Sequence, residues 1–199
     1  MLSKFLPRLL IVGAGGHGRS VAEAVLAAGI YEVAGFADDA SPALAQVGGH
    51  PMLGTSGDVT AYRTHADAAI VAIGNNALRE ALSSKLLAAG FELATVVHPR
   101  AIVSPSAVIG PGSAIMAGAI VGTEARLGGG VIVNCGAVVD HDAQVHDYGH
   151  LGVNACMSGG SVLGLSAWMQ AGSALGYGVK VADGAVLPPG AGVVSQYLA

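Results

Sequence analysis

The fold of this chain is decided by residues 97–192, which read VHPRAI VSPSAV IGPGSA IMAGAI VGTEAR LGGGVI VNCGAV VDHDAQ VHDYGH LGVNAC MSGGSV LGLSAW MQAGSA LGYGVK VADGAV LPPGAG. The sixteen hexads follow one another without insertion or deletion. Each begins with Val, Leu, Ile or Met and carries Ala, Ser, Gly or Val at its fifth position. A period of six fits neither an α-helix nor a simple two-residue alternation, so the chain must turn a corner once per hexad.

Three hexads close one triangular coil of eighteen residues. The large apolar residue at the first position is expected to point inward, and the fifth position leaves room only for a small side chain. Glycine at many second and fourth positions serves the turns, which need backbone angles that other residues resist. Successive coils pair strand on strand, and such a solenoid buries a core only by stacking its neighbours.

The first 96 residues follow a different pattern. Buried strands alternate with apolar-periodic helices, and this βαβ order predicts a parallel sheet. The expected elements are strands over 8–12, 32–37 and 68–73, helices over 19–28 and 76–89, and a segment over 91–97 that leads into the first coil. The change of period predicts two domains, residues 1–96 and residues 97–199.

Composition excludes several classes of protein. Charged residues make up only 11% of the chain and the net charge is −4. Beyond Arg100 the only basic side chains besides histidine are Arg126 and Lys180. Nucleic-acid binding needs several Lys or Arg contacts with phosphates, so this composition disfavours it. Cys135 and Cys156 have neither metal-ligand spacing nor a disulfide pattern, so we expect inert thiols.

The mean hydropathy of +0.60 is high for a protein that does not enter a membrane. In the most apolar stretch, residues 107–122, glycines and prolines fall at hexad corners, which indicates a solenoid and not a membrane span. Residues 1–20 run into a glycine loop without a signal cleavage site. We therefore expect a cytoplasmic protein with no membrane insertion.

A glycine loop follows the first predicted strand. Gly13, Gly15 and Gly18 match G-x-G-x-x-G, and Asp38 and Asp39 follow about twenty residues later, as in a dinucleotide-binding fingerprint. Backbone N–H groups and a helix N-terminus attract phosphate at such a loop. Fewer than a hundred residues supply half of a doubly wound domain, which suits one nucleotide better than two. A hydride-transfer enzyme is therefore disfavoured.

A histidine stands between two carboxylates in the sequence Asp140-His141-Asp142, a few residues before His146 and His150. Histidine is the natural general base at neutral pH, and an adjacent carboxylate fixes its tautomer and raises its basicity. The alternative interpretation is a solvated surface histidine with acidic neighbours.

Zinc is a second alternative, because some hexad β-helices bind zinc through three histidines of neighbouring subunits. His141 and His146 have a suitable spacing. The third ligand should lie two coils away, and the upstream positions hold Pro105 and Gly110, neither of which is a zinc ligand. We therefore predict no metal.

Several short motifs precede the hexads in order: Gly13-Ala14-Gly15-Gly16-His17-Gly18, Phe36-Ala37-Asp38-Asp39, Pro51-Met52-Leu53-Gly54, and Ala72-Ile73-Gly74-Asn75-Asn76 with Arg79. Together with the hexads they resemble the bacterial family of nucleotide-aminosugar N-acetyltransferases and sialic acid O-acetyltransferases, which are hexapeptide-repeat acyltransferases. The resemblance covers nearly the whole chain. It implies an α/β half-Rossmann N-terminal domain, followed by a left-handed parallel β-helix that binds acetyl-CoA as co-substrate.

The resemblance also implies a substrate pocket in the first domain. Gly15, Gly16 and His17 are expected to hold the diphosphate and sugar of a nucleotide sugar. Asp38 and Asp39 are expected to hold its base or ribose, and Gly74 to line the same pocket. The family usually ends in a G-x-P-A-K-like tail near the CoA adenine, whereas this sequence reads VVSQYLA over 193–199.

His141 and His150 are nine residues apart, which is half a coil, so on one subunit they lie toward opposite sides of the prism. They can meet only across an interface, and this predicts a homotrimer with the acetyl-CoA site between subunits. We expect His150 at a corner beside a column formed by Val153, Ala171 and Pro189, along which the pantetheine arm runs.

The sequence therefore predicts an acetyl-CoA-dependent N-acetyltransferase of glycan biosynthesis. It acts on the amino group of a nucleotide-linked amino sugar by direct transfer, with His141 as general base and Asp142 orienting the imidazole. His150, Ala171 and Pro189 are the expected acetyl-CoA contacts. O-acetylation of a sugar acid such as sialic acid and non-catalytic binding of a nucleotide sugar are the alternatives.

Overall fold

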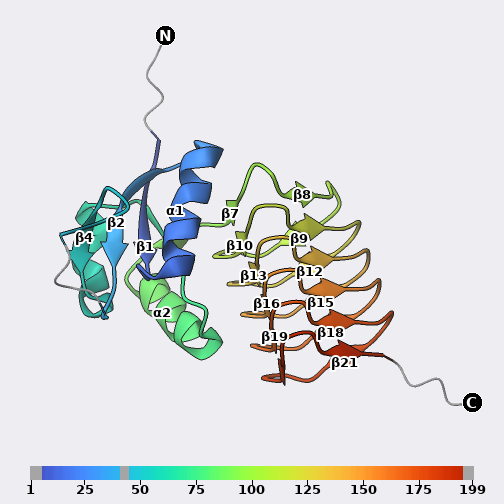
Figure 1. Cartoon of the computed structure of the whole chain (residues 1–199). Helices are drawn as coiled ribbons and strands as arrows, with labels where there is room; N and C mark the ends of the chain where they lie inside the picture. Colours follow the sequence, from blue (N-terminus) through green and yellow to red (C-terminus); the bar gives the residue numbers. More distant parts are fainter. Residues whose placement is uncertain (1–5, 41–44, 195–199) are drawn as a thin grey trace, which may run out of the picture. The chain divides into compact units, whose positions relative to one another are not determined.

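The computed structural model describes residues 6–40 and 45–194 (Figure 1), so the tail over 195–199 lies outside the described residues. The chain divides into two compact units, Met1–Pro99 and Arg100–Ala199. The predicted fold class is confirmed: a Rossmann-like α/β unit precedes a left-handed parallel β-helix.

The first unit is built on one six-stranded sheet in the order β3-β4-β2-β1-β5-β6. Its strands are β1 (Arg8–Val12), β2 (Glu32–Ala37), β3 (Gln46–Val47), β4 (His50–Gly54), β5 (Ala68–Val71) and β6 (Glu92–Leu93). Five of them run parallel, as predicted, but β3 pairs antiparallel with β4. Gly48 and Gly49 supply the positive φ angles of 58° and 84° that this tight hairpin needs.

Two α-helices and a 3₁₀ segment complete the first unit: α1 (Gly16–Ala28), α2 (Asn76–Ala88) and η1 (Ser56–Thr64). The helix expected from residue 19 begins three residues earlier, because Gly15 takes the extended conformation of an N-cap and the glycine loop already forms the first turn. Asn75 caps α2 by accepting a 2.9 Å hydrogen bond from the backbone N–H of Leu78. The sequence did not predict η1.

The sheet of the first unit is covered on both faces. Leu10 and Val12 of β1 pack in one cluster with Tyr62 of η1 and with Leu82 and Leu86 of α2. Side chains alternate along a strand, so the neighbouring residues of β1 face the other way, where α1 packs on β1 and β2. Parallel strands buried on both faces read as continuous apolar runs, which is why β1 could be recognised in the sequence.

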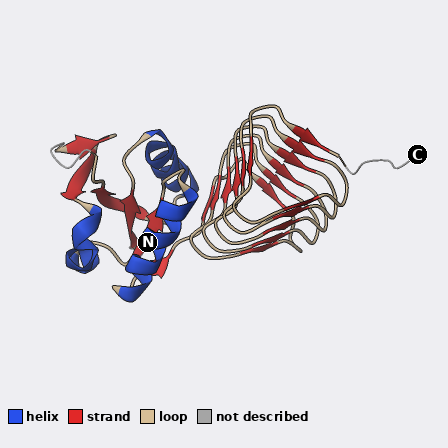
Figure 2. Ribbon diagram, turned by 90° about the horizontal axis from the view of Figure 1, so that it is seen from below, coloured by secondary structure: helices blue, strands red, loops and turns tan. Residues whose placement is uncertain are grey.

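The second unit repeats one two-residue strand per hexad. Figure 2 shows these strands lined up in stacks joined by loops. The strands are β8 (Ile102–Val103), β9 (Val108–Ile109), β10 (Ala114–Ile115), β11 (Ile120–Val121), β12 (Arg126–Leu127), β13 (Ile132–Val133), β14 (Val138–Val139), β15 (Gln144–Val145), β16 (His150–Leu151), β17 (Cys156–Met157), β18 (Val162–Leu163), β19 (Trp168–Met169), β20 (Ala174–Leu175), β21 (Lys180–Val181), β22 (Val186–Leu187) and β23 (Gly192–Val193). Strand β7 (Val96–Val97) precedes these strands and belongs to the first unit.

Three parallel sheets form the sides of the coil. We name them after their middle strands: the β14 sheet (β8-β11-β14-β17-β20-β23), the β15 sheet (β9-β12-β15-β18-β21) and the β16 sheet, which contains β10-β13-β16-β19-β22. Every pair is in register at a spacing of eighteen residues, for example Val139 with Met157. The first-position residues fill the interior, where Val139, Leu151, Met157 and Leu163 are fully buried.

From residue 112 onward, the fourth position of the hexad holds the left-handed backbone conformation. Glycine takes it in most coils, for example Gly136 and Gly160. Five residues with side chains also adopt it with φ between 51° and 59°: Glu124, Asp142, Tyr148, Asn154 and Ser166. Second-position glycines meet a different demand, since a Cβ on Gly122 would lie 2.8 Å from the backbone nitrogen of His141 in the next coil. Turn geometry and close coil stacking thus account for the two glycine positions.

Candidate functional site

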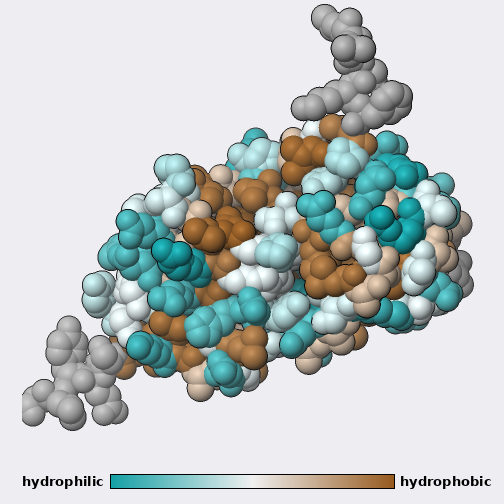
Figure 3. Space-filling model, turned by 180° about the vertical axis from the view of Figure 1, so that it is seen from behind, coloured by the Kyte–Doolittle hydropathy of each residue, from teal (hydrophilic) through white to brown (hydrophobic). Residues whose placement is uncertain are grey.

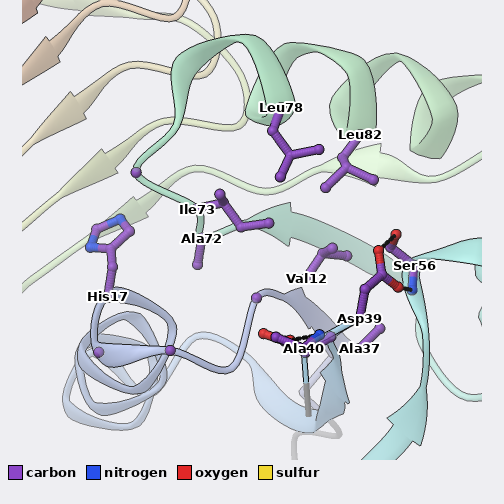
Figure 4. Close-up of a pocket in the computed structure, with 15 residues that line it drawn as sticks. Val12, His17, Ala37, Asp39, Ala40, Ser56, Ala72, Ile73, Leu78 and Leu82 are labelled. Atoms are coloured by element: carbon purple, nitrogen blue, oxygen red, sulfur yellow. Dashed lines mark hydrogen bonds between the residues drawn. The ribbon is translucent and has the colours of Figure 1, made fainter. Parts of the chain in front are cut away.

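A cavity of about 390 Å³ opens at the carboxyl ends of β1, β2 and β5 (Figure 4). Its lining comes from the glycine loop, from the residues after β2 and β5, from Ser56, and from Leu78 and Leu82 of α2. In open α/β sheets ligands bind at this edge, where the connections from a central strand diverge to opposite sides. All six substrate residues predicted from the sequence line this cavity: Gly15, Gly16, His17, Asp38, Asp39 and Gly74.

The glycines of the loop have two separate functions. A Cβ on Gly18 would lie 1.9 Å from the carbonyl oxygen of Gly13, and Gly13 itself has φ of 107°, so both are required for the strand-to-helix turn. A Cβ on Gly15 or Gly16 would meet no atom within 4 Å. These two glycines therefore keep space open at the N-terminus of α1, where backbone N–H groups favour an anion.

The two aspartates after β2 hold the walls of the cavity in place. Asp38 accepts hydrogen bonds from the backbone N–H of Ala14 (2.6 Å) and of Ala40 (2.7 Å). Asp39 accepts bonds from the N–H and hydroxyl of Ser56 (2.7 and 2.6 Å), which lower the pKa of its carboxyl group (Figure 4). A carboxylate has room for further donors, so a structural and a ligand-binding role are compatible. Ser56 was not predicted.

His17 lies in the first turn of α1 and faces the cavity across from Ile73 (Figure 4). Burial, and secondarily the positive charge of Arg79, lower the pKa of His17 to about 4, so its imidazole is neutral at pH 7. Its Nε2 atom is buried and has no hydrogen-bond partner among the described residues. A buried polar atom of this kind calls for a partner, which a bound ligand can supply.

His141 and Asp142 form a hydrogen-bonded pair at the corner between the β14 sheet and the β15 sheet. Their separation is 2.8 Å between Nδ1 and a carboxylate oxygen, and the second carboxylate, of Asp140, lies 3.9 Å from Nε2. The hydrogen bond that His141 donates to the Asp142 carboxylate, and then the charge of Asp140, raise the pKa of His141. About half of the His141 side chain is exposed to solvent. This geometry is that of an oriented base.

The corner that carries His141 is stacked with the same corner of later coils. Gly160 N–H donates to the carbonyl oxygen of His141 (3.0 Å), and Gly178 N–H donates to that of Gly159 (3.0 Å). The imidazole lies in the space that Gly159 leaves free, since a Cβ there would be 2.5 Å from both Cε1 and Nε2 of His141. The ring of Tyr177 is 6.3 Å from it. Neither Gly159 nor Tyr177 was predicted, although both lie at multiples of eighteen residues from His141.

The predicted corner position of His150 is wrong. His150 is the outer residue of β16, pairs with Trp168 in the next coil, and stacks on the indole ring at 5.4 Å with only 14° between the ring planes. Only 7% of it is exposed. The sixth position of a hexad belongs to a strand, and the corners are made by positions three and four. As expected, His141 and His150 lie on different sides of the coil.

The column of Val153, Ala171 and Pro189 is present at the corner between the β16 sheet and the β14 sheet. Gly172 N–H donates to the carbonyl oxygen of Val153 and Gly190 N–H to that of Ala171, both at 2.9 Å. The side chains of this column are exposed. Arg126 and Lys180 are the outer residues of strands in the β15 sheet, so one chain does not bring them to this column.

Within residues 6–40 and 45–194 there is no group of three or more His, Cys, Asp or Glu side chains arranged to hold a metal ion. Cys135 and Cys156 are free and partly buried. Neither helix found in these ranges has the length and apolar character needed to span a membrane.

Comparison with known proteins identifies the relatives of this chain. Residues 8–86 match the family model described as the PglD N-terminal domain. A mutant of perosamine N-acetyltransferase from Caulobacter crescentus, solved with CoA and GDP-perosamine, is 33% identical with a TM-score of 0.83; the match covers 94% of this chain and 91% of that one.

Two further structures extend the likeness. The acetyltransferase domain of PglB from Neisseria gonorrhoeae, solved with acetyl coenzyme A, is 35% identical with a TM-score of 0.78, over 96% of this chain and 97% of that one. WeeI from Acinetobacter baumannii shares the fold at 23% identity and a TM-score of 0.67, with 92% of each chain covered. The Caulobacter and Neisseria proteins are 33% and 35% identical to this chain and match more than nine-tenths of it, which confirms the predicted resemblance. The chain belongs to the family of nucleotide-aminosugar N-acetyltransferases.

Proposed function

We propose that this protein transfers the acetyl group of acetyl-CoA to the amino group of a nucleotide-linked amino sugar. The observation that carries the proposal is the pairing of His141 with Asp142 at 2.8 Å on an exposed corner of an acetyltransferase β-helix. The phosphate-binding type of cavity in the first unit, with Gly15, Gly16 and His17 at a helix N-terminus, supports a nucleotide sugar as the acceptor.

The chemistry follows from the state of the acceptor. A sugar amine is largely protonated at neutral pH and cannot attack until a proton leaves. The Nε2 atom of His141 takes this proton while Asp142 holds Nδ1–H, which fixes the tautomer and stabilises the imidazolium that forms. The amine nitrogen then bonds to the thioester carbonyl carbon, the carbon–sulfur bond breaks, and the second proton that the nitrogen loses passes to the departing CoA thiolate. His141 afterwards releases its own proton to solvent. The product is an acetamido sugar, and no acyl-enzyme is formed.

The acetyl-CoA site is proposed to lie between chains. Val153, Ala171 and Pro189 offer a column of small or flat side chains for the pantetheine arm, with His150 in the adjacent sheet. Arg126 and Lys180, the candidates for the CoA phosphates, lie on another side of the β-helix, and His141 lies at a corner away from the column. One chain therefore cannot gather these groups around one ligand, whereas neighbouring chains can.

An exposed apolar surface supports this association. The outer residues of the β14 sheet, which we call the outer stripe, are Ile102, Ile120, Val138, Cys156 and Ala174. Ile102 is 65% exposed and Ile120 is 37% exposed. Figure 3 shows apolar residues at the surface in several places. A contiguous apolar stripe on a surface marks an interaction site, and a threefold assembly would bury it beside His141. We propose a homotrimer that works in glycan biosynthesis in the cytoplasm.

The first test of the function is CoA release from acetyl-CoA with a UDP-linked 4-amino sugar, GDP-perosamine or free sialic acid as acceptor. We expect turnover with one nucleotide amino sugar and a loss of about 10²- to 10⁴-fold in kcat for His141→Ala. The exposed histidine control His65→Ala should retain full rate. Turnover with sialic acid alone would favour O-acetylation, and binding without any turnover would favour the non-catalytic alternative.

Asp142→Asn tests the orientation of the base. Asparagine tolerates the left-handed backbone at this position, so the fold is retained while the negative charge is lost. The carboxylate raises the pKa of His141, and His141 acts in its neutral form, so the acid limb of kcat/KM should move to lower pH and the plateau should fall. Glu124→Gln, at the same hexad position one coil earlier, is the control. An unshifted acid limb in Asp142→Asn would rule out the pairing as functional.

Gly159→Ala tests the position of the imidazole. The added methyl group would occupy the space of His141 Cε1 and Nε2, and the flexible imidazole is the group that must move. We expect kcat to fall about tenfold to a hundredfold, with a change of less than about 1 kcal/mol in the free energy of unfolding. Gly129→Ala is the matched control, because Gly129 has the same hexad position and a Cβ there would meet no atom closer than 3.4 Å. Equal rates for the two variants would contradict the assignment.

Sedimentation equilibrium tests the assembly. The expected particle has three times the chain mass of 19.5 kDa. Ile120→Glu places a charge in the outer stripe and should yield single chains that retain their circular dichroism but lose transferase activity. Leu87→Glu, at an exposed position of α2 that is 54% accessible, is the control and should remain trimeric. An active single chain would refute the shared site.

A further inference from the structure

Arg79 is the largest fully buried side chain of the molecule among the described residues, with 0% exposure. It belongs to the first turn of α2, directly behind the loop that follows β5. Arginine is almost never fully buried unless its N–H groups are hydrogen-bonded and the cost of burying its charge is offset by favourable interactions. None of the roles proposed above involves this side chain.

The guanidinium group of Arg79 fixes the loop that forms one wall of the nucleotide cavity. It donates to the carbonyl oxygen of Ile73 (2.9 Å) and, at 3.5 Å, to that of Gly74. It also donates to the side-chain oxygen of Asn76 (2.9 Å). Ile73 and Gly74 line the cavity, and Figure 4 shows the Ile73 side chain pointing into it beneath Leu78 of α2. Three acceptors held by one planar donor group leave this loop little freedom.

The charge of Arg79 also reaches the opposite wall. It contributes, after burial, to the lowered pKa of His17, which lies across the cavity from Ile73. A fixed cation that disfavours protonation of His17 favours an anion in the same place, because the two effects have one electrostatic origin. The N-terminus of α1, with Gly15 and Gly16 open in front of it, adds a second preference for negative charge.

We propose that Arg79 is a positioning residue for the diphosphate of the acceptor. It holds Ile73 and Gly74 in the cavity wall, and without touching the ligand its charge favours an anion at the His17 end of the cavity, which lies away from the carboxylate of Asp39 (Figure 4). The inference rests on the proposed nucleotide-sugar function and adds a residue that determines the preference for a nucleoside diphosphate over an uncharged nucleoside.

Calorimetric titration with UDP and GDP, and with uridine and guanosine, tests this role directly. Wild-type protein should bind one of the two diphosphates. Arg79→Gln should weaken that binding about tenfold or more and change the binding of the matching nucleoside much less. Arg63→Gln removes a cation from the same unit; this side chain packs over Phe91 at 4.7 Å and does not line the cavity, so diphosphate affinity should be unchanged.

A kinetic comparison separates positioning from general destabilisation. Arg79→Lys keeps the charge but loses the planar array of donors, so it should raise KM for the nucleotide sugar several-fold while kcat and KM for acetyl-CoA stay close to wild type. Should Arg79→Gln fail to fold, this variant decides the question. Unchanged diphosphate affinity in Arg79→Lys would then overturn the inference, as would unchanged affinity in a folded Arg79→Gln. A wild type that binds neither UDP nor GDP would instead refute the nucleotide-sugar function itself.

Discussion

The stacking of one coil on the next, in register at eighteen residues, is the constraint on which the functional geometry of the second unit depends. Each coil turns three corners, and from residue 112 onward each turn has a left-handed backbone at the fourth position of the hexad. Asp142 occupies such a position, so the corner itself turns its carboxylate toward Nδ1 of His141. Register then places Gly159 one coil later, beside the imidazole. The base, its orienting carboxylate and the space it occupies are thus all consequences of the coil.

In the first unit, hydrogen bonds hold the walls of the nucleotide cavity in place. Parallel strands direct their carboxyl ends to one edge, and the residues that follow β1, β2 and β5 meet there around one cavity. Asp38 and Asp39 fasten two of these segments through backbone and serine donors, and Arg79 fastens the third through carbonyl acceptors. The walls are therefore held by hydrogen bonds made before any ligand arrives, and preorganised walls reduce the ordering cost of binding.

The sequence predicted those features that repeat or that form long apolar runs. The β-helix followed from a six-residue period, and β1 and β2 were predicted with the bounds that the structure has, because both are short segments of mainly apolar residues. The hairpin of β3 and β4 was missed because β3 has two residues and β4 contains Pro51, a residue that disfavours a strand. The predicted family and its fold are confirmed, whereas the roles of the individual site residues remain predictions.

Contacts across coils and across the cavity were harder to foresee. The six-residue period alone does not say which positions of the hexad form the strand, so His150 was expected at a corner. The structure places His150 in β16, where its ring stacks on Trp168 in the next coil. Burial of Arg79 could not be predicted, since arginine is usually exposed and its acceptors are carbonyl groups with no signature in sequence. Gly159 and Tyr177 required the register of eighteen residues to be applied to His141.

The most direct test of the account is to follow the acetyl group itself. Protein incubated with isotope-labelled acetyl-CoA and the nucleotide amino sugar that supports turnover should yield, by NMR, one labelled amide on the sugar nitrogen, with no labelled protein at any time. Label found on a sugar hydroxyl, on a side chain of the protein or only in free acetate would contradict direct transfer of the acetyl group to the sugar nitrogen.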